Sequence, residues 1–236
     1  MAVSLELPII GRSIVAEKTA EILLGLEDAQ FDFIAGQYAR VTILNPTYED
    51  SRNNSREFSI ASSPNEKKYL KIAFRISESG FKKNILETQL GTKVMIEGPF
   101  GVFVLPKDHL RPIVFIAGGI GITPFLSMAT FAAENKSAHK IILLYANGSQ
   151  ESAPYLGELK ELEARNPNFL LRDKIGPLDD SFILESAGER LAPNSPCLWY
   201  IAGPPGMAQA ARQILLRNAV EEKNIYTEEF SGYEPK

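Results

Sequence analysis

The feature that most constrains the fold of this chain is a change in the spacing of its hydrophobic residues between Lys107 and Pro112. Up to Lys107, short segments rich in β-branched and aromatic residues are separated by turn residues. After Arg111, apolar segments alternate with stretches of helical spacing. The first pattern is typical of an antiparallel barrel, and the second predicts a parallel sheet with helices on both faces. We therefore expect two domains, over residues 1–108 and 109–236.

The expected strands and helices follow from these two spacing patterns. In the first half, the predicted strands are Ile14–Ala16, Ala20–Leu24, Tyr38–Leu44, Phe58–Ile60, Leu70–Ile76 and Lys93–Glu97. A short helix is expected over Lys82–Leu90, closed by Gly91. In the second half, the predicted strands are Pro112–Ala117, Lys140–Tyr145, Phe169–Arg172 and Leu198–Ala202, and the predicted helices are Pro124–Asn135, Leu156–Arg165 and Met207–Ala219.

Composition narrows the class of protein. The 236 residues carry a net charge of −4, which gives no electrostatic support to nucleic-acid binding. The single cysteine, Cys197, excludes an intrachain disulfide and a four-cysteine cluster, and it fits a reducing compartment. The N-terminus lacks the pattern of a signal peptide, and no apolar run reaches the ~18 residues of a membrane span. We expect a cytoplasmic protein without a membrane span.

A glycine-rich turn follows the first predicted strand of the second half. It runs from Gly118 and Gly119 through Gly121 to Thr123 and Pro124. Glycines at the end of a parallel strand allow the close approach of a pyrophosphate, and a helix N-terminus supplies unpaired N–H groups. Proline suits the first helical turn, where its missing N–H leaves nothing unpaired. The turn predicts a dinucleotide site, although a tight strand-to-helix turn without a ligand gives the same pattern.

A second glycine turn, Gly203–Met207, follows the predicted strand that ends at Ala202. Ligands of open parallel sheets gather at the carboxyl ends of the strands. Gly203, Pro204 and Met207 are therefore expected to line one crevice together with the first turn.

The first half contains an arginine, an aromatic ring and a hydroxyl close together in the segment Arg56–Ser62. On a strand, Arg56, Phe58 and Ile60 share one face and Ser59 lies on the other. An arginine can bind a pyrophosphate bidentately, an aromatic ring can cover a flat ring, and a hydroxyl can hydrogen-bond a ring nitrogen. An amphipathic strand with an exposed arginine has the same spacing, so spacing alone leaves the function open.

Together these segments resemble the ferredoxin–NADP reductase superfamily, over nearly the whole chain and in the family's order. The matching segments are Phe33–Tyr38, Arg56–Ser62 (similar to RxYSxxS), Glu97–Gly101, Gly118–Pro124 (similar to GGxGxTP), Gly203–Met207 (similar to GPxxM) and Glu228–Phe230 (similar to ExF). Ordered matches are far more specific than any one alone. The resemblance implies an antiparallel β-barrel that binds flavin, followed by a Rossmann-like parallel sheet that binds a nicotinamide dinucleotide.

The resemblance also implies roles for individual residues. Those implied to bind FAD are Arg56 at the pyrophosphate, Phe58 packed on the flavin, Ser59 near flavin N5, Ile60 in the same motif, Phe74, Arg75 and Ile76 beside the isoalloxazine and phosphates, and Phe81, Lys82 and Lys83 in a second phosphate turn that begins at Gly80. Those implied to bind the dinucleotide are Gly118, Gly119, Gly121, Thr123 and Pro124, with Gly203, Pro204 and Met207 flanking the nicotinamide. The implied catalytic residues are Ser59, Glu228 and Phe230, and Phe230 covers the flavin until it is displaced. No metal ligand is implied.

Three positions depart from the family pattern. Phe58 replaces a tyrosine and lacks its hydroxyl. Lys83 stands where serine is common, and it either offers its charge to a phosphate or is a solvated residue on the helix surface. Ala202 replaces a cysteine, which removes a thiol beside the nicotinamide.

The choice between NADH and NADPH depends on cations near the ribose. No Ser-Arg pair occurs at Lys174–Leu178, in register with the pair that binds the 2′-phosphate of NADPH in relatives. Without a cation, that phosphate is poorly paired. We expect NADH, with Arg172 and Lys174 as the residues that would instead allow NADPH.

The expected function is hydride transfer from NAD(P)H to FAD N5, followed by electron transfer to an acceptor. Because the sequence has no cysteine-rich segment, we expect a separate acceptor, which is a ferredoxin-like protein, an oxygenase component or a small molecule. The alternative is a non-catalytic flavin-binding electron-transfer or redox-sensing subunit of a larger complex. His109 and His139 are interpreted as surface residues, and Asp179 and Asp180 as a helix N-cap segment.

Overall fold

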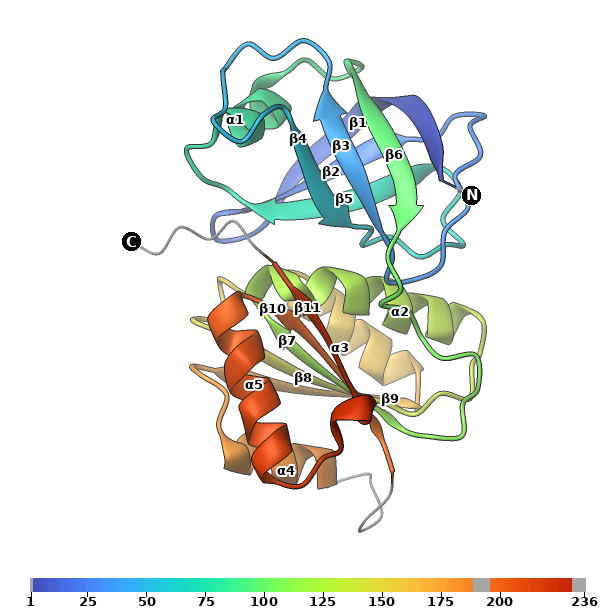
Figure 1. Cartoon of the computed structure of the whole chain (residues 1–236). Coiled ribbons are helices and arrows are strands. Elements are labelled where there is room, and N and C mark those ends of the chain that lie inside the picture. The colour runs from blue at the N-terminus through green and yellow to red at the C-terminus, as the bar shows by residue number, and fades with distance from the viewer. Residues whose placement is uncertain (1, 189–195, 231–236) are drawn as a thin grey trace.

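The computed structural model describes residues 2–188 and 196–230. They fold into two units, each built on its own β-sheet, and the first unit lies above the second in Figure 1. The last strand of the first sheet ends at Phe100, and the first strand of the second sheet begins at Ile113. The expected domain boundary at Asp108 falls within the connection between them.

The first sheet is antiparallel. Its strands are β1 (Val3–Ala16), β2 (Thr19–Gly25), β3 (Tyr38–Ile43), β4 (Ser55–Ser59), β5 (Tyr69–Arg75) and β6 (Lys93–Phe100), in the spatial order β4-β3-β6-β1-β2-β5. The two ends of this order come together, because β4 contacts β5 and the Ala61 N–H donates to the Lys71 carbonyl at 2.8 Å. The sheet therefore closes into the predicted barrel, around a core that includes Ile22, Ile72 and Phe81.

Helix α1 (Gly80–Glu87) covers one end of the barrel (Figure 1). Its first turn is capped by the Ser79 hydroxyl, which accepts the Lys82 N–H at 3.2 Å. Phe81 and Ile85 lie on the face that the helix buries in the barrel core. The helix begins and ends earlier than the predicted segment.

Strand β1 is much longer than predicted, because it serves two neighbours. Val3–Pro8 pairs with β6, and Ile9–Ala16 pairs with β2. The register shifts between Ile9 and Gly11, which lets the strand turn from one neighbour to the other. Pro8 and Gly11 interrupt its β-forming residues, so the sequence pattern predicts only the end of this strand.

The second sheet is parallel throughout. Its strands are β7 (Ile113–Gly118), β8 (Ile141–Asn147), β9 (Phe169–Ile175), β10 (Leu198–Gly203) and β11 (Ile225–Glu229), in the order β11-β10-β7-β8-β9. Its helices are α2 (Ile122–Glu134), α3 (Leu156–Arg165), α4 (Asp180–Gly188) and α5 (Pro205–Arg217), with short 3₁₀ turns at Gly119–Gly121 and Glu222–Asn224. The described residues contain no helix long and apolar enough to cross a bilayer.

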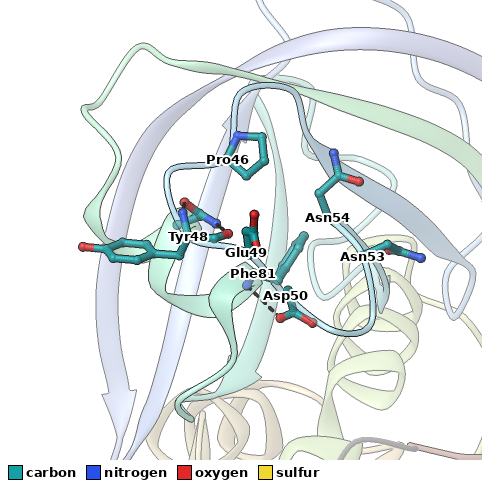
Figure 2. Close-up of a pocket in the computed structure, with 8 residues that line it drawn as sticks. Pro46, Tyr48, Glu49, Asp50, Asn53, Asn54 and Phe81 are labelled. Atoms are coloured by element: carbon teal, nitrogen blue, oxygen red, sulfur yellow. Dashed lines mark hydrogen bonds between the residues drawn. The ribbon is translucent and has the colours of Figure 1, made fainter.

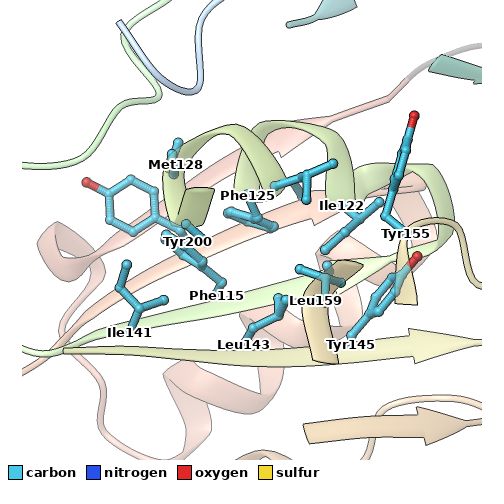
Figure 3. Close-up of a cluster of buried hydrophobic side chains, with 14 of the residues drawn as sticks. Phe115, Ile122, Phe125, Met128, Ile141, Leu143, Tyr145, Tyr155, Leu159 and Tyr200 are labelled. Carbon is cyan, nitrogen blue, oxygen red and sulfur yellow. The ribbon is translucent and has the colours of Figure 1, made fainter. Parts of the chain in front are cut away.

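Both faces of the second sheet are buried, and β7 shows why its sequence is continuously apolar. Ile113 and Phe115 join the core beneath α2 and α3, where Phe115 stacks on Phe125 with ring centroids 4.4 Å apart (Figure 3). Val114 and Ile116 join the opposite core beneath α4 and α5. Alternate residues of the same strand therefore fill two different cores.

Two elements of the second half were not predicted. Helix α4 is short and poorly amphipathic, and its N-terminus is the Asp179 segment, whose Oδ1 accepts the Phe182 N–H at 2.9 Å. The N-cap interpretation of Asp179 is thus confirmed. Strand β11 is a half-exposed edge strand without an apolar run, so it gives only a weak pattern.

The strand order reverses between β7 and β10. The chain winds from β7 to β8 and β9, then crosses to β10 on the other side of β7. The carboxyl ends of β7 and β10 therefore adjoin at the switch point, where open parallel sheets bind their ligands.

Buried polar bonds join the barrel to the side of the second sheet that α2 and α3 cover. The Tyr155 hydroxyl points away from the apolar cluster (Figure 3) and donates to the Glu21 carboxylate of β2 at 2.9 Å. Burial and the nearby Glu21 charge raise the pKa of Tyr155, so the hydroxyl keeps its proton and remains a donor. The Ser127 hydroxyl of α2 donates to the Ser62 carbonyl at 2.7 Å.

We expect Tyr155→Phe to lower the free energy of unfolding by about 1–3 kcal/mol, because a buried hydrogen bond to a carboxylate is lost. Urea unfolding followed by circular dichroism measures this. The control is Tyr48→Phe, since Tyr48 also donates to a glutamate, Glu87, at 2.5 Å but is 39% exposed. Equal losses in the two variants would contradict the importance of burial.

Candidate active site

The two glycine turns contact each other at the carboxyl edge of the second sheet. An ideal Cβ on Gly121 would lie 2.2 Å from the Ala202 carbonyl oxygen, which is impossible without backbone movement. A Cβ on Gly118 or Gly203 would lie 2.7 Å or 2.4 Å from Met207 Cε. Glycine is therefore required at position 121, where the neighbour is backbone, whereas the flexible Met207 side chain could move away from a Cβ at position 118. The structure brings these predicted residues together.

The first turn is fixed by hydroxyl groups. Gly119 has a φ of +54°, a conformation that suits glycine. The Thr123 hydroxyl donates to the Ile120 carbonyl at 3.0 Å. The Tyr145 hydroxyl, at the end of the cluster in Figure 3, lies 3.1 Å from the Gly119 carbonyl oxygen. Tyr145 was not predicted, because nothing in its own strand indicates a contact with the turn.

The C-terminal segment runs beside the second turn. The Phe230 N–H donates to the Gly203 carbonyl at 3.0 Å, and the half-buried Phe230 packs against the core that contains Ala61 of the barrel. Glu228 lies opposite Ala202 in the β10–β11 register. Burial raises the pKa of Glu228 to about 7, so this carboxyl group is only partly ionised at neutral pH.

On the barrel side, the predicted flavin residues form an aromatic cluster. Phe58 of β4 lies 5.7 Å from Phe74 and 5.8 Å from Phe81 between ring centroids. The Arg56 guanidinium lies over Phe81, at 5.3 Å from the ring centroid. Ile60 follows the strand and is fully buried in the barrel core. Arg56 and Phe58 share a face of β4, as predicted.

Ser59 lies at the end of β4 with its hydroxyl buried, and Oγ has no hydrogen-bond partner in the described part of the chain. The same holds for Glu228 Oε2 and Asn147 Oδ1. A buried polar atom without a partner fits a site that a polar ligand completes. Ser59 and Glu228 carry predicted roles, whereas Asn147, at the carboxyl end of β8, was not predicted.

Arg75 joins the two domains. Its guanidinium donates to the Glu17 carbonyl of the barrel at 2.8 Å and to the Ser152 carbonyl of the loop after β8 at 2.9 Å. Strand β5, which also carries Phe74, contacts the 3₁₀ turn Gly119–Gly121. The predicted flavin strand thus lies against the predicted dinucleotide turn. Ile76 follows β5 and packs on the barrel core.

The two lysines of α1 have different surroundings. Burial, followed by the charges of Arg56 and Arg52, lowers the pKa of Lys82. Lys83 Nζ lies 2.7 Å from the exposed Glu78 carboxylate. This pairing favours the solvated-surface interpretation of Lys83.

His139 is not a surface residue, which corrects the prediction. Its side chain is buried, with Nε2 3.1 Å from the carbonyl oxygens of Pro106 and Asp108 and Nδ1 2.6 Å from Ser137 Oγ. Two carbonyl acceptors require a proton on Nε2, so His139 fastens the connection between the sheets. His109 is exposed. Across residues 2–188 and 196–230, no group of three or more His, Cys, Asp or Glu could hold a metal ion.

Two family models match the chain, one in each half. The oxidoreductase FAD-binding domain matches residues 6–105, and the oxidoreductase NAD-binding domain matches residues 115–213. Among solved structures, ferredoxin-NADP⁺ reductase from Plasmodium falciparum has a TM-score of 0.79 at 21% identity, over 96% of each chain. A cytochrome P450 reductase from Amycolatopsis has a TM-score of 0.81 at 22% identity, over 97% of this chain and 70% of that one.

The curated relatives are longer than this chain. It is 30% identical to the electron transfer component of anthranilate 1,2-dioxygenase from Acinetobacter baylyi, over 94% of this chain and 66% of that protein. It is 25% identical to the reductase component of propane 2-monooxygenase from Rhodococcus jostii, over 89% of this chain and 59% of that protein. It is 26% identical to the electron transfer component of toluate 1,2-dioxygenase from Pseudomonas putida, over 86% of this chain and 60% of that protein. The chain thus spans 59% to 66% of the length of these three relatives.

The antiparallel barrel thus coincides with the oxidoreductase FAD-binding domain, and the parallel sheet with its paired glycine turns coincides with the oxidoreductase NAD-binding domain. The chain belongs to the ferredoxin–NADP reductase superfamily.

We expect Gly121→Ala to destabilise the protein by about 2 kcal/mol or more, because the new methyl group forces the two turns apart. The control is Gly206→Ala in α5, where a Cβ meets nothing within 4 Å. That variant is expected to keep or slightly raise the thermal midpoint. Similar midpoints for the two variants would show that the turns do not need their close approach.

We also expect Glu228→Gln to change the pH dependence of stability. The folded pKa of Glu228, about 7, lies above its ordinary value of 4.5, so the folded state binds the proton more tightly. Stability from this group is present below pH 4.5 and is lost as the pH rises through 7. The neutral glutamine escapes this loss. Unfolding at pH 5 and pH 8 should show a variant that gains on the order of 1–3 kcal/mol relative to wild type at the higher pH.

The matched control for this pH experiment is Glu229→Gln, at an exposed neighbouring position. Its difference from wild type should be the same at both pH values. If Glu228→Gln behaved in the same way, Glu228 would not be a buried protonated group.

Proposed function

We propose that this protein is an NAD(P)H-dependent flavoprotein reductase that passes electrons to a separate acceptor. The contact of β5 with the Gly119–Gly121 turn carries this proposal, because it sets the barrel's flavin strand against the dinucleotide edge. The acceptor would be an oxygenase component, a ferredoxin-like protein or a small molecule. The relatives named as electron transfer or reductase components of dioxygenases and a monooxygenase support the first of these.

In this proposal FAD supplies the chemistry, since it accepts hydride at N5 and releases electrons singly. The chain supplies position and exclusion of water. Ser59 offers a buried hydroxyl with no protein partner in the described residues, suited to a ring nitrogen. Glu228 offers a carboxyl group whose raised pKa, about 7, leaves it partly protonated at neutral pH. Phe230 would cover the flavin and move aside for the nicotinamide.

NADH is the proposed donor. The two cations that would favour NADPH have carboxylate partners, since Arg172 Nη1 lies 3.8 Å from Glu163 Oε1 and Lys174 pairs with Asp179. Lys174 also lies over the Phe182 ring, 5.1 Å from its centroid. A 2′-phosphate would have to compete with these carboxylates for its cations.

We also propose a cytoplasmic location. Cys197 is a buried thiol, and burial raises its pKa to about 11, so it is kept from reacting rather than exposed for a disulfide.

The experiment that tests the function is anaerobic stopped-flow absorbance of the FAD-loaded protein at the flavin maximum. We expect rapid bleaching by NADH and bleaching at least about tenfold slower, per unit concentration, by NADPH. Bound flavin that neither donor bleaches would contradict the reductase and would favour a non-catalytic flavin-binding subunit.

A further inference from the structure

The place that should receive the FAD diphosphate already holds an anion of the chain itself. Asp50, in the loop between β3 and β4, accepts the Phe81 N–H of α1 through Oδ2 at 2.9 Å (Figure 2). Its Oδ1 accepts from Arg56 Nη2 at 2.5 Å and from the Arg52 N–H at 2.8 Å. One carboxylate therefore occupies both predicted phosphate donors, the arginine and the N-terminus of the helix.

The Arg56 guanidinium is otherwise bound to the same loop. Its Nη1 donates to the carbonyl oxygens of Arg52, Asn53 and Ser55, at 2.8, 3.1 and 2.7 Å. The side chains of Arg56 and Asp50 are only 12% and 6% exposed. A diphosphate has no access to this guanidinium while the loop stays in place.

The loop itself is clamped over α1. The Asn84 side chain accepts the Thr47 and Tyr48 N–H groups at 2.7 and 3.0 Å and donates to the Tyr48 carbonyl at 2.8 Å. A Cβ on Gly80 would lie 2.0 Å from the Glu49 carbonyl oxygen, so the loop backbone lies directly on the predicted phosphate turn. A small cavity of about 270 Å³ between this loop and Phe81 remains beside the clamp (Figure 2).

We propose that Asp50 is a resident anion in the FAD diphosphate site, and that FAD loads by exchange, with its diphosphate replacing the Asp50 carboxylate on Arg56 and the Phe81 N–H. This rests on the proposed flavin binding. The exchange follows from charge, because a carboxylate and a diphosphate repel each other and require the same donors. The residues from Pro46 to Asn54, hereafter the 46–54 loop, must then leave the helix N-terminus.

The carboxylate is charged at every working pH. Burial alone would raise the pKa of Asp50, but hydrogen bonds from Phe81, Arg52 and Arg56 outweigh it and lower the pKa to about 2. The competition with FAD is therefore permanent rather than switched by protonation. Asp50 therefore lowers the affinity of the protein for flavin, and it keeps Arg56 paired when flavin is absent.

The test compares Asp50→Asn with Glu49→Gln. Both remove one negative charge from the same loop, but Glu49 is exposed, and it is Asp50 whose carboxylate binds Arg56 and the Phe81 N–H. Titration of each apoprotein with FAD, followed by quenching of flavin fluorescence, gives the dissociation constants. We expect Asp50→Asn to bind FAD about tenfold more tightly than wild type, and Glu49→Gln to bind within about twofold of wild type.

Two results would overturn the exchange. Unchanged or weaker binding by Asp50→Asn would mean that Asp50 organises Arg56 for the flavin rather than competing with it. An equal gain in FAD affinity for Glu49→Gln would mean that the loss of any negative charge from this loop accounts for the effect. If none of the three proteins bound FAD, the proposed function would fail together with the exchange, whereas FAD binding with equal affinities overturns the exchange alone.

A second measurement uses the unaltered protein, so it holds even if Asp50→Asn does not fold. Hydrogen–deuterium exchange with and without FAD should show faster exchange in the 46–54 loop when FAD is bound. The start of α1 should be protected at the same time. Protection of both segments by FAD would show that the loop stays in place and would overturn the proposal.

Discussion

The buried interface between the barrel and the α2 and α3 side of the parallel sheet determines where every other part of the site lies. Tyr155 and Glu21, both buried, meet across it in a hydrogen bond of 2.9 Å. Ser127 binds the Ser62 carbonyl, three residues beyond Ser59, and Arg75 binds a carbonyl oxygen of each domain. Buried polar groups are expensive to leave unpaired, so these bonds select one arrangement of the two domains.

That arrangement explains how a site for two cofactors can be built with few charged side chains. The proposed dinucleotide edge consists of backbone, held close by Gly121 against Ala202 and contacted by the Tyr145 hydroxyl. The proposed flavin side consists of aromatic rings and of the buried Ser59 hydroxyl. The cofactors supply the reactive atoms, so the protein needs position more than it needs acids and bases. Buried ionisable groups lie on both sides of the site: Glu228 on the dinucleotide side and the Arg56–Asp50 pair on the barrel side.

The fold and the site were predictable where the cause is local, and not where the partners are distant. The spacing of hydrophobic residues predicted a strand-rich first half, an alternating second half and strand β7, and the glycine turns were recognised because they follow apolar strands. Most of β1 was missed, because Pro8 and Gly11 interrupt it and its pairing changes along its length. The contact of Asp50 with Phe81 joins residues far apart in the sequence, and no local sequence pattern predicts it. His139 was misplaced for the same reason, since the carbonyl groups that bury it belong to the connection between the sheets.

The proposed reductase requires a fixed interface, which would present one face of the nicotinamide to the flavin, and stereospecific isotope transfer tests this requirement most directly. Single-turnover reduction of the FAD-loaded protein would be followed with NADH carrying deuterium at one or the other C4 position. We predict that one labelled donor transfers its deuterium, with a primary isotope effect on flavin bleaching, and that the other retains it. Deuterium loss from both donors would contradict a fixed arrangement of the two domains.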